Sequence, residues 1–271
     1  MPRRGALPVE QSKKRWLKMA AAGVALLALT WLYTYWARDR YQAVDEILPE
    51  LYLAPQQHEA AAPDPMAFTL GDYAFTVTPL YDYQIWALVV SAKNYGSFTF
   101  SRSDRVIPVD LCLIWGTNVH NNRHQAPDVH FSQRRRFCFF RYRETSIDPA
   151  QVSNNHLIPA NAEVRDVIKR IRPGDQIRLR GQLVSVDASL MARFTGLDPA
   201  EFSLRSSTNR DDTGAGACEI IFVREAEILR AANPVTRALF SLTSVLLLIL
   251  ISGGALWGGR QWWRRLQEDD G

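Results

Sequence analysis

The stretch Val245-Leu246-Leu247-Leu248-Ile249-Leu250-Ile251 lies near the centre of a run without charge from Ala238 to Gly259. The run contains 22 residues. At a rise of about 1.5 Å per residue, it is long enough to cross a hydrocarbon layer about 30 Å thick. It also lacks the polar face that a surface helix of a soluble domain carries. The sequence therefore predicts a transmembrane helix over residues 238–259.

A second run without charge extends from Met19 to Trp36, near the other end of the chain. A cleaved signal peptide needs small residues just beyond its apolar stretch, but this run ends in the aromatic residues Trp31, Tyr33, Tyr35 and Trp36. Aromatic side chains of this kind gather at the interface between membrane and water. We therefore expect residues 19–36 to form an uncleaved transmembrane helix.

The positive charges that flank the two spans predict their orientation. Six precede the first span and three follow the second: Arg3, Arg4, Lys13, Lys14, Arg15 and Lys18, then Arg260, Arg264 and Arg265. Positively charged flanks stay in the cytoplasm, so residues 1–18 and 260–271 are expected to be cytoplasmic tails. The central domain then lies outside, in the periplasm if the membrane is the inner membrane of a Gram-negative bacterium.

The distribution of charge also argues against a nucleic-acid partner. The chain has a net charge of +4, but residues 39–236 carry −3 and the basic excess lies at the two ends. A slightly acidic domain lacks the positive field that captures phosphate backbones. The one stretch that mixes arginine with aromatic residues, Arg134–Arg143, is interpreted as a strand with a buried aromatic face and solvated arginines.

The central segment begins with an expected stalk helix and linker over residues 37–65. Tyr41, Val44, Ile47 and Leu48 have helical spacing within 38–48, and 55–65 has the composition of a linker. Residues 66–232 then form the expected domain. Its strand-like runs are 73–78, 85–90, 109–115, 137–142, 176–186, 202–206 and 218–223, with one helix over 161–171. The sequence predicts a mainly β fold, a small barrel or sandwich with one internal helix, flanked by the two transmembrane helices.

One strand carries a resemblance to a known fold. Pro173-Gly174-Asp175-Gln176-Ile177-Arg178-Leu179-Arg180-Gly181-Gln182-Leu183-Val184 resembles the strand of OB-fold barrels in which a glycine allows the strand to bend. More broadly, residues 72–229 resemble uncharacterised bacterial membrane-anchored proteins, on the stretches 110–116, 153–157 and 212–219. The resemblance implies an OB-like extracytoplasmic domain and no particular activity.

The sequence offers candidate chemistry at several places but no coherent catalytic set. Asp212-Thr213-Gly214 matches the aspartic-protease triplet, but those enzymes need two such aspartates and the chain has a single copy. His120, His124 and His130 match no common zinc spacing. No metal and no cofactor are expected. Because loops at strand ends carry function, we predict a ligand-binding site from Trp115, Asn118, Asn154, His156, Arg210, Asp211 and Asp212.

The three cysteines, Cys112, Cys138 and Cys218, allow one disulfide and leave one thiol over. An oxidising compartment permits a bridge. Cys112–Cys138 is the favoured pair, while Cys138–Cys218, Cys112–Cys218 and three free thiols remain open. Of the three thiols, only that of Cys138 has the positive surroundings that would make it reactive.

The function expected from these features is that of a membrane-anchored binding module. The domain would bind a membrane or periplasmic protein partner or an envelope ligand, and Gly254 and Gly258 could mediate self-association in the membrane. The alternative is an envelope hydrolase that uses Asp211, Asp212 and His156 or the loop histidines. A channel or transporter is disfavoured, because neither span carries a charge at its centre.

Overall fold

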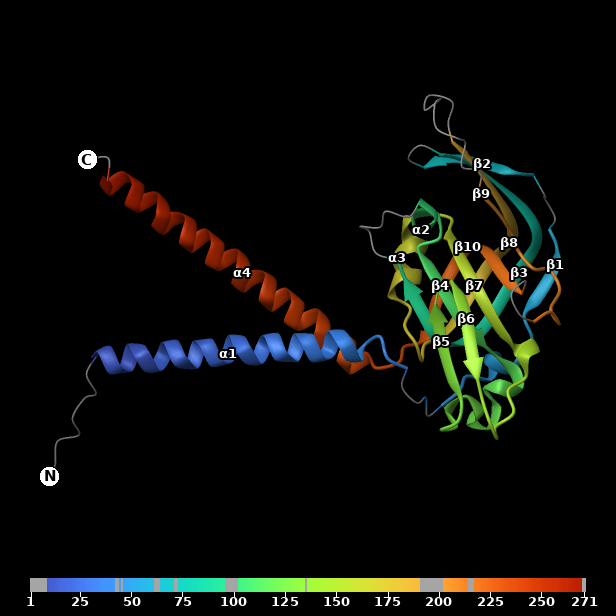
Figure 1. Ribbon diagram of the computed structural model, residues 1–271, viewed down its shortest axis with the longest axis horizontal. Helices are drawn as coiled ribbons and strands as arrows, with labels where there is room; N and C mark the ends of the chain where they lie inside the picture. Colours follow the sequence, from blue (N-terminus) through green and yellow to red (C-terminus); the bar gives the residue numbers. More distant parts are fainter. Residues whose placement is uncertain are drawn as a thin grey trace. The chain divides into compact units, whose positions relative to one another are not determined.

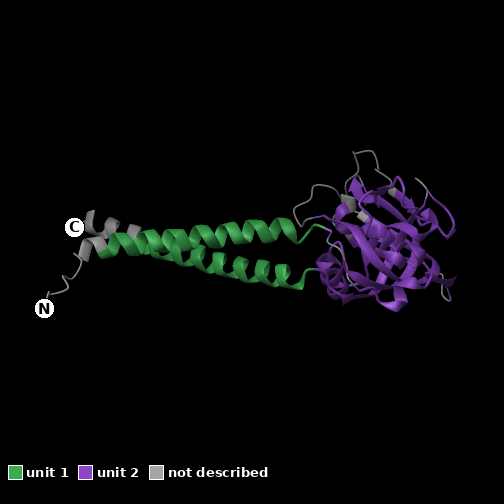
Figure 2. Ribbon diagram, turned by 90° about the horizontal axis from the view of Figure 1, so that it is seen from below, with its two compact units in different colours: residues 1–40, 233–271 green, residues 41–232 purple. Residues whose placement is uncertain are grey.

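The computed structural model describes residues 9–41, 44, 46–60, 64–70, 73–95, 102–134, 136–190, 202–213 and 217–269. The chain divides into two compact units (Figure 2). One unit consists of residues 1–40 and 233–271, and the other consists of residues 41–232. Each unit is described by itself.

The first unit contains the two long apolar helices, α1 (Val9–Ala37) and α4 (Pro234–Asp269). Segments Ser12–Ala37 and Pro234–Arg260 are long and apolar enough to cross a membrane. The helices contact each other through Trp31, whose Nε1 donates to Ser244 Oγ at 2.9 Å and whose ring stacks on Phe240. The guanidinium of Arg38 also lies over the Phe240 ring, 3.9 Å from the ring centroid. Both spans predicted from the sequence therefore lie within long helices.

The second unit is built on an eight-stranded mixed sheet, with a separate two-stranded hairpin (Figure 1). The strands of the large sheet are β1 (Gln56–Glu59), β2 (Met66–Leu70), β3 (Tyr73–Asn94), β4 (Val109–Ile114), β7 (Val152–Pro159), β8 (Gln176–Leu190), β9 (Phe202–Arg205) and β10 (Cys218–Arg230). The hairpin consists of β5 (His130–Arg134) and β6 (Phe137–Arg141). Short helices are α2 (Arg102–Val106), α3 (Ala162–Arg170), η1 (Pro49–Tyr52), η2 (Gly116–Asn118), η3 (His120–Gln125) and η4 (Pro149–Gln151).

Five strands follow one another in a ring of pairings. β3 pairs with β4, β4 with β7, β7 with β10, β10 with β8, and β8 again with β3. Four of these pairings are antiparallel, and only β7 and β10 run parallel. The large sheet is therefore mixed, with a single parallel pairing in its ring.

Alternate residues of the five strands bury one continuous core. It includes Ile85, Leu111, Leu157, Leu179 and Ile221, each of them fully buried. Helix α3 adds an apolar stripe of Val164 and Ile168 to the same cluster. The α3 N-terminus is capped by Asn161, whose side chain accepts from Val164 N at 2.9 Å.

Gly181 occupies a place where β8 has no room for a side chain. A Cβ there would overlap the carbonyl oxygen of Phe222 on β10. Opposite it, the register between β10 and β8 shifts between Val223 and Glu225, so Arg224 is an extra residue in the ladder. A bulge of this kind bends a strand and lets its partner approach closely, which requires glycine at the point of contact.

The prediction of a stalk helix over residues 38–48 is wrong. Helix α1 ends at Ala37, and the described residues from Arg38 to Leu48 are not helical. The fully buried side chain of Gln176 replaces the helical hydrogen bonds: its Oε1 accepts from Leu48 N at 2.8 Å and its Nε2 donates to Glu46 O at 2.6 Å. The apolar residues with helical spacing instead pack on the domain in an irregular segment, against Leu88 and Ile114.

Two further expectations need correction. Part of the predicted linker, Gln56–Glu59, forms the edge strand β1 against β3. The aromatic face predicted to be buried in β6 points outward instead, since the side chains of Phe137 and Phe139 are 42% and 45% exposed. The hairpin turns its Cys138 and Phe140 side inward, because Cys138 is bonded to the sheet.

Candidate functional site

The face of β4, β7 and β10 beneath the β5–β6 hairpin carries a row of polar side chains. In the register of the sheet, Asp110 of β4 lies directly opposite His156 of β7. Cys218 of β10 lies opposite Asn154, two residues before His156. Residues two apart on a strand share a face, so these four side chains point to the same side of the sheet. We call Asp110, His156, Cys218 and Asn154 the polar row.

Asp110 is the charged centre of the polar row and is fully buried. Its Oδ1 lies 2.9 Å from His156 Nδ1 and accepts from Arg136 Nη1 at 3.0 Å, while its Oδ2 accepts from Tyr95 OH at 2.7 Å. Arg136 comes from the β5–β6 turn, where it adopts a φ of 68°, and also pairs with Asp104. The carboxylate is thus satisfied by two cationic groups and one hydroxyl, as a buried charge requires.

His156 connects Asp110 to Cys218. Asn154 Nδ2 lies 3.4 Å from His156 Nε2 and 3.2 Å from Cys218 Sγ, so it is next to both groups. Burial alone would lower the pKa of His156, but the hydrogen bonds and charges of Asp110 and Cys218 raise it to about 9. The imidazole therefore carries a proton at neutral pH and holds a positive charge next to the thiol.

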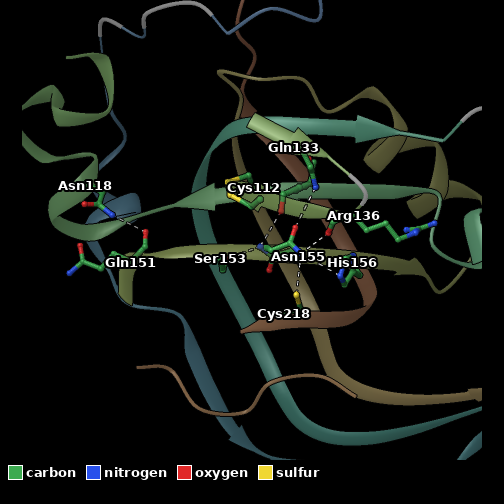
Figure 3. The surroundings of a disulfide bond; sticks show 12 residues. Cys112, Asn118, Gln133, Arg136, Gln151, Ser153, Asn155, His156 and Cys218 are labelled. Carbon is green, nitrogen blue, oxygen red and sulfur yellow. Dashed lines mark hydrogen bonds between the residues drawn. A yellow bond between two sulfur atoms is a disulfide. The ribbon is translucent and has the colours of Figure 1, made fainter. Parts of the chain in front are cut away.

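The cysteines divide into one disulfide and one free thiol. Cys112 and Cys138 are bonded, which is the pairing that the sequence favoured, and the bond ties the hairpin to β4 (Figure 3). Cys218 is free and half-buried. Reactivity was expected only at Cys138, but the structure places that residue in the disulfide and puts the free thiol of Cys218 beside an imidazolium.

An apolar groove adjoins the polar row. Its cavity measures about 360 Å³. One wall is the outer edge of β6, Phe137–Phe140, and the opposite wall includes Val152, Asn154, Thr213 and Ala217. We call it the β6 groove. Asn154 belongs to both the groove and the polar row, and Ala217 directly precedes Cys218, so the thiol lies at the groove's border.

A second polar cluster occupies the other face of β10. Arg210 Nη1 lies 3.0 Å from Glu219 Oε1 and 3.4 Å from Tyr83 OH. Glu219 Oε2 and Asn155 Oδ1 are buried without a hydrogen-bond partner, and the two residues lie opposite each other in the register of β10 and β7. Burial raises the pKa of Glu219 to about 7 although Arg210 lowers it. A protonated Glu219 can donate a hydrogen bond that a carboxylate cannot.

The predicted site residues fall into four places rather than one. Asn154 and His156 belong to the polar row, and Arg210 belongs to the Glu219 cluster. Asp212 accepts from Ser207 Oγ in the loop before β10, and Asp211 is exposed. Trp115 and Asn118 are buried structural residues: Asn118 Oδ1 accepts from Asp148 N at 2.8 Å, and its Nδ2 donates to Asp148 O. No described contact brings His156 to Asp211 or Asp212.

The loop histidines also lie apart from one another. His124 is buried with its Nδ1 3.3 Å from Asn118 O, and burial lowers its pKa to about 4. His120 lies edge-on against the ring of Tyr52, and His130 is exposed on β5. Asp128 binds three backbone N–H groups and the Thr145 hydroxyl, and these bonds hold its pKa well below its usual range. Within the described residues, no group of three or more His, Cys, Asp and Glu side chains could hold a metal ion.

Comparisons of the chain with protein-family models, curated proteins and solved structures found no match. The case for a function therefore rests on the polar row, the β6 groove and the two apolar helices. Sequence reasoning missed Asp110, Cys218 and Glu219. Asp110 was the single polar interruption of an apolar strand, 109–115, which is the signal that could have marked it as functional.

Proposed function

We propose that the chain is a membrane-anchored module whose outer domain binds an extended segment of a partner protein along the β6 groove. The observation that carries the proposal is the open edge of β6. This strand pairs with β5 on one side and, among the described strands, with no other. Its other edge borders an apolar groove that Phe137 and Phe139 leave partly open to solvent.

A free strand edge next to an apolar groove suits an extended peptide. Backbone N–H and C=O groups of the edge can pair with an added strand, and pockets beside the edge take alternate side chains. Exposed edges are otherwise a hazard that soluble proteins cover or charge. Of the strand's outward-facing residues 137, 139 and 141, only Arg141 carries a charge, so the edge is left largely available for pairing.

The fold that we propose for this domain is an OB-like barrel. Its support is the ring of pairings among β3, β4, β7, β10 and β8, with one core inside it and α3 between β7 and β8. Such five-stranded barrels commonly bind extended ligands across their strands. The glycine of the resembling strand, Gly181, stands opposite a bulge, in keeping with the bend that the resemblance implies.

Binding at the β6 groove predicts selection of short apolar peptides. We expect the full-length protein in lipid nanodiscs to select, from a pool of random eight-residue peptides, sequences with apolar residues at alternate positions. Replacing Phe137 and Phe139 with Asp should weaken binding at least ~10-fold, because each change puts a charge in an apolar contact. Replacing Gln56 and His58 with Asp, at alternate exposed positions of the edge strand β1 and outside the groove, serves as the matched control.

The mode of binding has its own readout. Amide hydrogen exchange of residues 137–141 should slow when a selected peptide is added, because an added strand protects the amides of the free edge. A pool that yields no binder, or an equal loss in the control with Asp at positions 56 and 58, would contradict the proposed function. Binding without added protection would show side-chain docking in place of strand addition.

We further propose that the domain lies outside the cytoplasm, with both termini inside the cell and the spans in a bacterial inner membrane. The support is the basic flank at each terminus and the two helices long and apolar enough to cross. Alkaline phosphatase, which is active only outside the cytoplasm, should be inactive when fused after Gly271 and active when inserted at residue 61. Activity at the C-terminal fusion would overturn this orientation.

A further inference from the structure

The polar row has the order of groups that covalent catalysis by a thiol requires. A nucleophile lies beside a nitrogen base, and a carboxylate orients that base through its other nitrogen. Asn154 Nδ2 lies 3.2 Å from Cys218 Sγ and 3.4 Å from His156 Nε2, so thiol and imidazole adjoin the same amide. Asp110 Oδ1 lies 2.9 Å from His156 Nδ1. The three come from three neighbouring strands, β10, β7 and β4, so the register of the sheet holds their spacing.

We infer that Cys218 is the nucleophile of an acyl-transfer site that cleaves a peptide bound in the β6 groove, with His156 as its acid and base and Asp110 as a positioning residue. This inference rests on the proposed function, because the groove supplies the substrate. Two residues that line the groove adjoin the thiol. Asn154 contacts Cys218 Sγ, and Ala217 directly precedes Cys218 in the chain.

A positive charge and a hydrogen-bond donor both lie beside the thiol. The positive charge of His156 lies beside it, and Asn154 Nδ2 donates to Cys218 Sγ at 3.2 Å. A thiolate next to an imidazolium is the nucleophilic form of a cysteine. Arg136 and Tyr95 donate hydrogen bonds to the Asp110 carboxylate and hold it in place. The carboxylate can therefore keep the imidazole in one orientation. The half-buried Cys218 remains open to a reactant.

The reaction balances with groups that the chain and water provide. The Cys218 thiolate attacks the carbonyl carbon of the peptide, a C–S bond forms, and the π electrons move onto the oxygen. Collapse of this intermediate breaks the C–N bond, and the leaving amine takes the proton from His156 Nε2. Water, deprotonated by the now neutral His156, then attacks the thioester. Its collapse releases the carboxylic acid and restores the thiolate and imidazolium.

The first test is the pH dependence of alkylation. The chain has three cysteines and two are bonded, so iodoacetamide reports on Cys218 in the full-length protein in mild detergent. A free thiol with a pKa of about 8.5 loses roughly 150-fold in rate from pH 8.5 to pH 6. We expect this loss in the unfolded chain and less than a ~5-fold loss in the native chain. A native profile as steep as the unfolded one would overturn the inference without any variant.

Variants then assign the roles. His156→Gln should restore the steep profile, and Asp110→Asn should shift the profile toward it, which a merely structural carboxylate would not do. His130→Gln, an exposed histidine on β5, is the matched control and should leave the profile unchanged. If either buried variant fails to fold, the native profile above still decides.

The second test is an acyl adduct. The p-nitrophenyl ester of N-acetylphenylalanine should release a burst of about one p-nitrophenolate per chain. Mass spectrometry should find the acyl group on Cys218, and Cys218→Ser should abolish the burst. If peptides bind the groove but no adduct forms, the inference fails and the proposed function stands. If the adduct forms but no peptide binds, the β6 groove is not the substrate site and the proposed function fails.

Discussion

Replacing Asp110 with Ala is expected to lower the free energy of unfolding of the outer domain by about 3–5 kcal/mol, because it removes the counter-charge of the buried His156 and one acidic partner of Arg136. Asp110 is fully buried and bonds to Arg136, His156 and Tyr95. Arg136 would keep only Asp104 as an acidic partner, and the protonated form of His156 would keep none on its Nδ1 side. Denaturant unfolding of the full-length protein in detergent, followed by tryptophan fluorescence, measures the loss.

The control for this prediction is Glu225→Ala on β10. Glu225 is exposed and pairs with Arg178 and Arg180 at the surface of the sheet. Exposed pairs contribute between 0 and about 1 kcal/mol, so this variant should unfold almost like the native protein. Similar losses from the two variants would mean that the polar row is not the buried electrostatic centre of the domain.

The second large effect is a pH dependence that Glu219 imposes on stability. Its pKa is 4.5 in the unfolded chain and about 7 in the folded domain, where burial favours the neutral acid. The folded state therefore binds more protons than the unfolded state between these values, and stability falls as the pH rises through this window. At 1.36 kcal/mol per pKa unit, the full loss is about 3 kcal/mol and is complete above pH 7.

Glu219→Gln removes this titration and keeps a side chain that can accept from Arg210 and donate toward Asn155. The stability of the native protein minus that of the variant should fall by about 3 kcal/mol between pH 4.5 and pH 7 and stay constant above it. Taking the difference cancels His124, whose lowered pKa gives an opposite slope in both proteins. Glu227→Gln, exposed on the same strand, is the control. Parallel curves for Glu219→Gln and the native protein would contradict the prediction.

Much of the fold follows from local sequence patterns. Long uncharged runs mark α1 and α4, alternation marks β8, and the Asn161 cap with its apolar stripe marks α3. The predicted stalk helix does not form, and the reason is nonlocal. Its apolar spacing resembles a helix, yet Gln176, more than a hundred residues away, binds its backbone and holds it in another conformation. The prediction of a buried aromatic face on β6 is wrong because the disulfide through Cys138 fixes which side of the strand faces the sheet.

The candidate site was less accessible to sequence reasoning. His156 and Asn154 stand out as polar residues at a predicted strand, but their partners come from other strands. Asp110 and Cys218 lie 46 and 62 positions from His156, and only the register of three strands brings them together. Sequence alone also favoured Cys138 over Cys218 as a reactive thiol, because the arginines beside Cys138 are adjacent in the chain, whereas the imidazole near Cys218 lies on another strand.

The order of the strands has a consequence for biosynthesis. The parallel neighbour of β7 is β10, which comes last in the chain among the strands of the ring. β10 ends at Arg230, four residues before α4 begins. All the other strands of the ring have therefore been synthesised before β10 can fill the gap between β7 and β8. Until then β7 and β8 each present an edge that lacks its later partner, open to mispairing with other chains. Folding of the domain is therefore expected to need a chaperone that shields these edges, or rapid arrival of β10, to shorten that exposed interval.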